Sequence, residues 1–107
     1  MEIRQYDIVL VNLDPTIGSE IRKTRPCAVI SPNEMNQFLN TIVIAPMTSQ
    51  IKLFPTRVKV NHDNKIGWIV IDQIRTIDKQ RVIRILDHLT YREIEKVKSV
   101  LKETYVD

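Results

Sequence analysis

Glycine, cysteine and histidine are scarce in this 107-residue chain, and each shortage removes a class of function. The two glycines, Gly18 and Gly67, are far apart, so the chain has no glycine-rich loop that could cradle a nucleotide phosphate. The one cysteine, Cys27, rules out an intrachain disulfide, and its place in an apolar run is typical of a small buried hydrophobe. This cysteine usage fits a reducing cytosol, so we expect a cytoplasmic protein.

The chain also lacks a set of metal ligands and a hydrophobic run that could cross a membrane. His62, His88 and Cys27 are the only soft ligands and are scattered, so we expect no metal site and no cofactor. There is no run of 18 apolar residues and no charged-then-apolar opening segment, so we expect neither a membrane span nor a signal segment. A two-histidine ribonuclease mechanism stays open.

What is present fits one globular domain, residues 1–107. The hydrophobic fraction is 43% and the charged fraction 27%, which are ordinary values for such a domain. The net charge is +3 and permits a polyanionic partner; the whole excess lies before Thr90. The chain is long enough for a core, yet short enough to gain stability from a partner.

Apolar, β-branched runs predict a mainly β fold. We expect strands at residues 7–13, 24–30, 41–46, 56–60, 67–71 and 81–86, with a turn at 61–65 and polar connections at 47–50 and 72–80. Pro26 should lie at the start or edge of its strand, and Pro46 should help to end the third strand. Mostly antiparallel strands with short connections favour a compact barrel or a strongly curved sheet.

Two capping boxes predict two helices. Ser31-Pro32-Asn33-Glu34 predicts a short helix that runs to about Leu39. Thr90-Tyr91-Arg92-Glu93 predicts a second helix, and apolar side chains then recur at helical spacing. These side chains are Ile94, Val97, Val100, Leu101 and Tyr105.

The stretch of residues 14–26, DPTIGSEIRKTRP, joins the first two predicted strands. It is longer and more polar than a connection between strands requires. Long ordered polar loops on β scaffolds often carry binding or catalysis. The alternative interpretation, which the spacing alone allows as readily, is a solvated surface loop without a function.

A polar set without metal or histidine remains for chemistry: Glu20, Arg25, Thr48 and Ser49, with Asp72, Gln73 and Arg75 as possible neighbours. If the second and third strands pair antiparallel with 29 opposite 44, then 25 lies opposite 48, with Cβ atoms about 4.5–5.5 Å apart. This register would put a forked guanidinium beside a hydroxyl, which suits a phosphate. A surface ion pair of Arg25 with Glu20 or Asp14 is the alternative.

Two further features have two interpretations each. The cluster Arg75, Lys79, Arg81 and Arg84 could guide phosphates or form a solvated face. Trp68 lies in an apolar strand, where a tryptophan is more often a core residue than a platform for base stacking.

Three separated stretches carry a family resemblance: LDPTIGSEIRKTRP at 13–26, IAPMTS at 44–49 and DQIRTIDKQR at 72–81. Each alone is weak, but in this order and spacing they resemble the MazF/PemK family of toxin endoribonucleases over essentially the whole chain. The resemblance implies a mainly β fold with helices, a small SH3-like barrel of the MazF/CcdB type. A short helix would follow strand two, and another would end the chain.

The resemblance also implies a function. The protein would be the toxin of a type II toxin–antitoxin system, a homodimer that cleaves single-stranded RNA at short sequences without a metal ion. Such an mRNA interferase uses the RNA's own 2′-hydroxyl, is neutralised by a cognate MazE-like antitoxin, and binds DNA together with that antitoxin.

The family's functional residues carry over to individual positions. The catalytic arginine falls on Arg25 and the catalytic hydroxyl on Thr48. Beside this carry-over, Glu20 is the nearest candidate base in the sequence, or a group that only orients Arg25. Ile21 departs from the family, because many relatives carry a polar residue there, often Gln. RNA contacts are expected at Thr16, Ser19, Lys23, Ser49, Gln73, Arg75, Lys79 and Arg81.

Two other classes of function stay open. CcdB toxins share the implied fold but bind gyrase and cleave nothing, through a C-terminal end that carries Trp and Gly. This chain ends in KETYVD, with neither residue. A non-catalytic RNA-binding barrel is the third interpretation.

Overall fold

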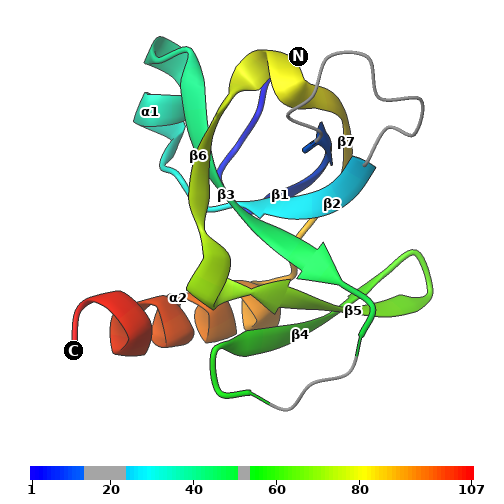
Figure 1. Cartoon of the computed structure of the whole chain (residues 1–107), viewed down its shortest axis with the longest axis vertical. Helices are drawn as coiled ribbons and strands as arrows, with labels where there is room; N and C mark the ends of the chain where they lie inside the picture. Colours follow the sequence, from blue (N-terminus) through cyan, green and yellow to red (C-terminus); the bar gives the residue numbers. More distant parts are fainter. Residues whose placement is uncertain (14–23, 51–53) are drawn as a thin grey trace.

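The computed structural model describes residues 1–13, 24–50 and 54–107, which form a strongly curved antiparallel sheet with helices at its edges (Figure 1). The strands are β1 (Asp7–Asn12), β2 (Thr24–Val29), β3 (Thr41–Thr48), β4 (Arg57–His62), β5 (Lys65–Val70), β6 (Arg75–Asp78) and β7 (Val82–His88). The helices are α1 (Asn33–Phe38), the 3-10 turns η1 (Ile71–Gln73) and η2 (Lys79–Arg81), and α2 (Tyr91–Tyr105). Among the described residues, no helix is long and apolar enough to cross a membrane.

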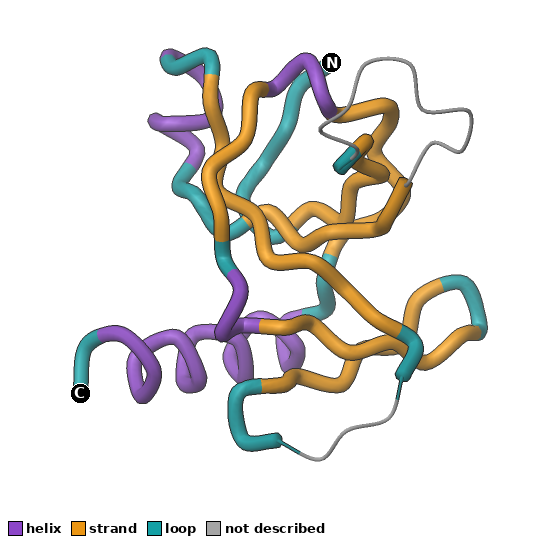
Figure 2. Tube along the Cα trace, viewed as in Figure 1, coloured by secondary structure: helices purple, strands orange, loops and turns teal. Residues whose placement is uncertain are grey.

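Strand β3 belongs to both halves of the sheet. The strand order is β4-β5-β3-β2-β1-β7, and β6 pairs with the first half of β3. Residues Thr41 to Ile44 pair with β6, whereas Met47 and Thr48 pair with β5. Strands β1, β2, β6 and β7 curl together above β3, and β4, β5 and α2 lie below it (Figures 1 and 2). The barrel predicted from the sequence is therefore a half-barrel.

Side-chain alternation along the strands separates the apolar residues into two buried clusters. In β3, Ile42 and Ile44 belong to one cluster, whereas Ala45 and Met47 belong to the other. The upper cluster comprises Val9, Val11, Cys27, Val29, Ile42, Ile44, Ile77 and Val82. The lower cluster comprises Ile8, Ala28, Ala45, Met47, Val58, Val60, Ile69, Ile71, Leu89, Val97 and Val100.

Helix α2 covers the lower cluster and begins as the sequence predicts. The Thr90 hydroxyl accepts from the Glu93 N–H, and the Glu93 carboxylate accepts from the Thr90 N–H, so the capping box is confirmed. The other Glu93 oxygen accepts from the Asn61 N–H at 3.0 Å. One carboxylate therefore both starts α2 and holds it against β4.

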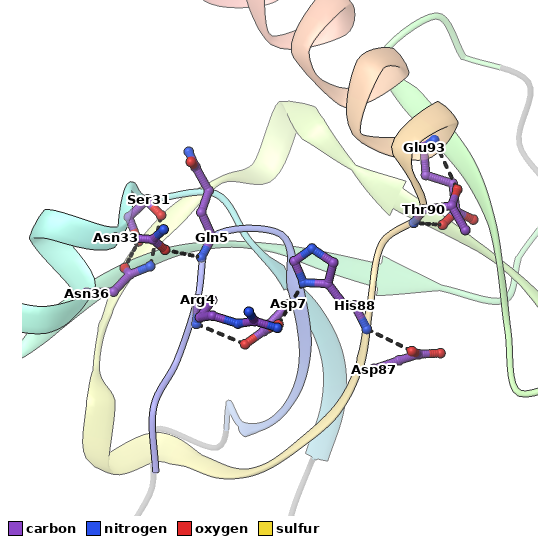
Figure 3. A network of polar contacts seen from close by, with 10 residues as sticks. All are labelled: Arg4, Gln5, Asp7, Ser31, Asn33, Asn36, Asp87, His88, Thr90 and Glu93. Atoms are coloured by element: carbon purple, nitrogen blue, oxygen red, sulfur yellow. Dashed lines mark hydrogen bonds and ion pairs between the residues drawn. The ribbon is translucent and has the colours of Figure 1, made fainter.

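Polar contacts attach the N-terminal segment to the rest of the fold (Figure 3). Buried Asp7 accepts from the Arg4 N–H at 2.9 Å, and its other oxygen lies 2.8 Å from His88 Nδ1. The Gln5 N–H donates to Asn33 Oδ1 at 2.8 Å. The segment before β1 is thus tied to both β7 and α1.

Two strand predictions are wrong. Residues 72–80 are not a plain polar connection, because 75–78 form β6 and complete the half-barrel along β3. Pro46 does not end the third strand, which continues to Thr48. The strand survives the missing N–H because Pro46 lies between two ladders of β3, after the pairing with β6 has ended at Ile44 and before the pairing with β5 begins at Met47.

The first predicted capping box is also wrong. Helix α1 has Pro32 as its N-cap and no side-chain cap bond. The Ser31 hydroxyl is buried and used elsewhere: it donates to Asn36 Oδ1 and accepts from the Val43 N–H. Tertiary burial has recruited the predicted capping group to satisfy β3 and a buried amide instead.

The predicted turn between β4 and β5 is confirmed in a tighter form. His62 pairs with Lys65, which leaves Asp63 and Asn64 as a two-residue loop. Both have a left-handed backbone, with φ of 54° and 58°. This is the geometry of a type I′ hairpin, and Asp and Asn tolerate it better than most other residues.

We predict that Thr90→Ala lowers the free energy of unfolding by about 1 kcal/mol, because one N–H at the start of α2 loses its acceptor. Chemical denaturation would measure the change, with Ser99→Ala on the exposed middle of α2 as the control. Equal stabilities of the two variants would show that the cap contributes nothing.

Candidate active site

Arg25, Thr48, Trp68 and Lys59 form a row across four neighbouring strands, which we call the transverse row. Thr48 on β3 lies directly opposite Trp68 on β5, and Trp68 lies opposite Lys59 on β4. The β2–β3 pairs run from Val29–Ile44 to Cys27–Pro46, which confirms the predicted register, and the same register leads on to 25 and 48. Because neighbouring strands lie about 4.8 Å apart, the row spans about 14 Å.

The transverse row lies on the face of the sheet away from α2. Met47, Ile69 and Val58 each adjoin a residue of the row in sequence and pack in the lower cluster beneath α2. Alternation therefore places Thr48, Trp68 and Lys59 on the opposite face. Arg25 is opposite Val11, an upper-cluster residue, and so lies on the same side.

The structure prepares the Thr48 hydroxyl to donate a hydrogen bond. Its oxygen accepts from the Gln50 N–H at 3.2 Å, which uses one lone pair and leaves the O–H available. Thr48 is half-buried and Arg25 is exposed. A guanidinium and a held hydroxyl together suit the oxygens of a phosphate.

The pKa of the Cys27 thiol is affected by positive charges near this site. Burial raises the pKa of its thiol to about 12, and the charges of Arg25 and Arg75 oppose that rise. The thiol therefore stays protonated and unreactive, as its apolar surroundings in the sequence predicted. Two separate strands bring cationic side chains toward the same part of the upper cluster.

A cavity of about 600 Å³ adjoins the transverse row. Its lining includes Arg25, Thr48 and Ser49, so the structure brings these three predicted site residues together. Pro26 and Met47 also line it, and they alternate with Arg25 and Thr48 along their strands. Arg25 and Thr48 therefore stand at the edge of the cavity.

The two histidines have separate carboxylate partners. His62 Nδ1 lies 2.8 Å from Asp87, and His88 Nδ1 lies 2.8 Å from Asp7. Because a carboxylate only accepts, each Nδ1 carries the hydrogen. The hydrogen bond from His62, with one from the His88 N–H, holds the pKa of the Asp87 carboxyl below its usual range. Of the two histidines, only His62 lines the cavity, so the structure does not support a two-histidine site.

The other predicted RNA-contact residues that the structure describes do not line this cavity. Gln73 is exposed in η1, and Arg75 is exposed at the start of β6, opposite Ile44. Lys79 lines a second cavity of about 420 Å³ beside the N-terminal segment and α1. Arg81 donates to the Asn12 carbonyl at 3.2 Å. Of the predicted cluster, Arg84 alone lines the first cavity.

Several predictions lie outside the described residues: Thr16, Ser19, Glu20, Ile21 and Lys23 all belong to residues 14–23.

The interpretation of Trp68 as a core residue is wrong. Trp68 is half-buried and belongs to neither buried cluster, nor to the partly buried side chains packed against them. The signal that could have located Trp68 and Lys59 beside Thr48 is the pairing of residues 57–62 with 65–70, which fixes which side chains share a face.

The fold is a small half-barrel with a polar site at one end of β3, and the comparisons with known proteins give its class. Residues 4–105 match the family model described as PemK-like, MazF-like toxin of type II toxin–antitoxin system. The chain belongs to this family. It is 34% identical to Endoribonuclease EndoA of Bacillus subtilis (strain 168), over 95% of this chain and 93% of EndoA.

Solved structures confirm the predicted fold. A MazE–MazF crystal structure from Deinococcus radiodurans (Form-II) has a TM-score of 0.83 at 24% identity, over 96% of this chain and 95% of that one. A mycobacterial endoribonuclease in complex with its cognate antitoxin has a TM-score of 0.77 at 19% identity, over 95% and 91%. The small barrel with a short helix after β2 and a C-terminal helix is therefore the MazF fold.

Proposed function

We propose that this toxin, which is an endoribonuclease by its relationship to EndoA, cleaves single-stranded RNA at short sequences without a metal ion. The observation that carries the proposal is the meeting of Arg25 and Thr48 at the edge of one cavity, where the Thr48 hydroxyl accepts from the Gln50 N–H and donates to no group among the described residues. The attacking group is the substrate's own 2′-hydroxyl. This group is already next to the phosphorus, so proximity replaces a recruited nucleophile.

In the proposed reaction, a bond forms between the 2′-oxygen and phosphorus, and the bond from phosphorus to the 5′-oxygen breaks. Arg25 stays protonated and holds the oxygens of the phosphorane with its forked donors. Thr48 donates a second hydrogen bond to them, while the Gln50 N–H keeps its hydroxyl in place. Each such donor is worth about 3–4 kcal/mol in the transition state if it resembles an oxyanion-hole donor.

Glu20 is the proposed base that removes the 2′-proton, or else it orients Arg25. The 5′-oxygen leaves with a proton from solvent. Ser49 follows Thr48 and lines the same cavity, so it is placed to contact the bound RNA. We propose that the protein acts in the cytoplasm. We also propose further RNA contacts from Thr16, Ser19, Lys23, Gln73, Arg75, Lys79 and Arg81.

We predict that Arg25→Ala and Thr48→Ala each lower the cleavage rate by about 10²–10³ and leave the fold intact, because each removes a donor to the transition state. Single-turnover cleavage would measure the loss, with Arg92→Ala and Ser99→Ala on exposed α2 as matched controls. Glu20→Gln separates its two roles: a large loss supports a base, and a small one supports orientation. Unchanged rates for both Arg25→Ala and Thr48→Ala would remove the catalytic assignment.

The chemistry of the products tests the nucleophile. Replacing the single 2′-hydroxyl at the cut by hydrogen should stop cleavage and barely change binding, because phosphate and base contacts persist. The first products should carry a 2′,3′-cyclic phosphate and a free 5′-hydroxyl, and excess chelator should leave the rate within about twofold. Mass spectrometry of a short cleaved oligonucleotide decides the point. A 5′-phosphate, or cutting of the deoxy substrate, would mean that water attacks.

The proposed assembly is a two-fold homodimer. A MazE-like antitoxin neutralises this dimer, and the toxin and antitoxin together bind DNA. The MazE–MazF and antitoxin complexes of structural relatives support the partner, and a two-fold dimer is the commonest oligomer of a small domain. We predict sedimentation at about twice the chain mass of 12.5 kDa at micromolar concentration. A single species at the monomer mass would refute the dimer.

A further inference from the structure

Trp68 is an aromatic side chain held next to the catalytic hydroxyl without a place in the core. It lies directly opposite Thr48 and outside both buried clusters. Its indole Nε1 is covered, yet finds no hydrogen-bond partner in the described part of the chain. A covered indole N–H without a hydrogen-bond partner costs free energy, so stability alone does not explain a tryptophan at this position.

The surroundings of Trp68 on this face are cationic. Lys59 lies directly opposite Trp68 on β4 and is exposed. Arg57, two residues before Lys59, shares the same face, with its guanidinium 5.6 Å from the centre of the Phe54 ring. Arg25 stands at the other end of the row. The charge along this face therefore complements a polyanion.

We propose that Trp68 and Lys59 form a nucleotide subsite, in which a base that flanks the scissile phosphate stacks on the indole and Lys59 holds the next phosphate. The inference rests on the proposed function, because Arg25 and Thr48 define where the scissile phosphate lies. Trp68 lies one strand, about 4.8 Å, from Thr48, and Lys59 lies one strand further, so the subsite directly adjoins the position of the scissile phosphate. Stacking on an aromatic ring, with cations along the backbone, is a general way in which proteins hold single-stranded RNA.

This subsite acts on every base, because each base has a π-face. It therefore secures the register of the strand at the cut and leaves sequence choice to other contacts. Trp68 is in this sense a substrate-binding residue, and its loss should weaken binding more than it slows the chemical step.

The chain contains a single tryptophan, so its fluorescence reports on Trp68 alone. The probe is a short RNA that carries the protein's own mapped cut site, with a 2′-deoxy residue at the cut to prevent cleavage. Titration should quench the fluorescence. An abasic residue on one side of the cut should abolish the quench, and an abasic residue on the other side should leave it unchanged. Fluorescein anisotropy of the same RNA follows binding independently.

Variants separate stacking from a structural role. Trp68→Leu should weaken binding of the deoxy probe by about 10- to 100-fold, whereas Trp68→Phe, which keeps an aromatic face, should stay within about threefold. Tyr91→Leu, on the exposed start of α2, is the matched aromatic control and should bind normally. If Trp68→Leu fails to fold, the Trp68→Phe variant and the abasic series still test the inference.

Lys59 is tested by salt. Lys59→Gln should reduce the slope of log affinity against log salt by about one, as expected for one lost phosphate contact. Lys98→Gln on α2 is the control and should leave the slope unchanged. An equal slope for Lys59→Gln and the native protein would remove Lys59 from the subsite.

The outcomes distinguish this inference from the proposed function. A protein that cuts RNA while the probe binds without quenching, or with the same quench for every abasic probe, would overturn only the role of Trp68. A protein that binds and quenches but cuts nothing would overturn the catalytic proposal and keep the stacking subsite. A Trp68 signal that responds to the antitoxin and not to RNA would show a protein-binding face, and the inference would be wrong.

Discussion

The change of partner along β3 is the constraint on which the rest of the structure depends. Along one edge, its first half pairs with β6 and closes the half-barrel, and its last two residues pair with β5; β2 pairs with the middle of β3 on the other edge. One strand therefore serves two packed layers, each with its own buried cluster. Pro46 lies at the point of change, between the ladder with β6, which ends at Ile44, and the ladder with β5, which begins at Met47.

The same change creates the site. Because the end of β3 pairs with β5 on one edge and β2 lies along the other edge, Thr48 stands between Arg25 and Trp68. Had β3 stopped at Pro46, the hydroxyl would lie in a free loop, without Trp68 opposite it. The lower cluster beneath α2 fixes the orientation of this region, since Met47, Ile69 and Val58 must be buried and their neighbours must then face the other way.

Sequence patterns correctly predicted the features that depend on interactions between residues close in sequence. The α2 capping box needs only Thr90 and Glu93, and it formed as expected. The register of 29 opposite 44, which the sequence allowed as one possible pairing, is the one that the structure has. The capping box at Ser31 failed, because its hydroxyl has a better use in a buried network with Asn36 and Val43. The sequence did not predict strand β6, because Ile77 is its only apolar residue. Its pairing with β3 in the structure identifies it as a strand.

The sequence by itself determined the family, the mainly β architecture and the terminal helix, and it singled out Arg25 and Thr48 as candidates, since motif and periodicity are properties of the chain in order. Only the tertiary structure decided what stands beside that pair. Trp68 looked like a core residue because it lies in an apolar strand, and Ile69, Val70 and Ile71, which follow it, are indeed buried. The face of the sheet on which the Trp68 side chain lies depends on the pairing of β5 with both β3 and β4. Such pairing is fixed by the packing of the whole sheet.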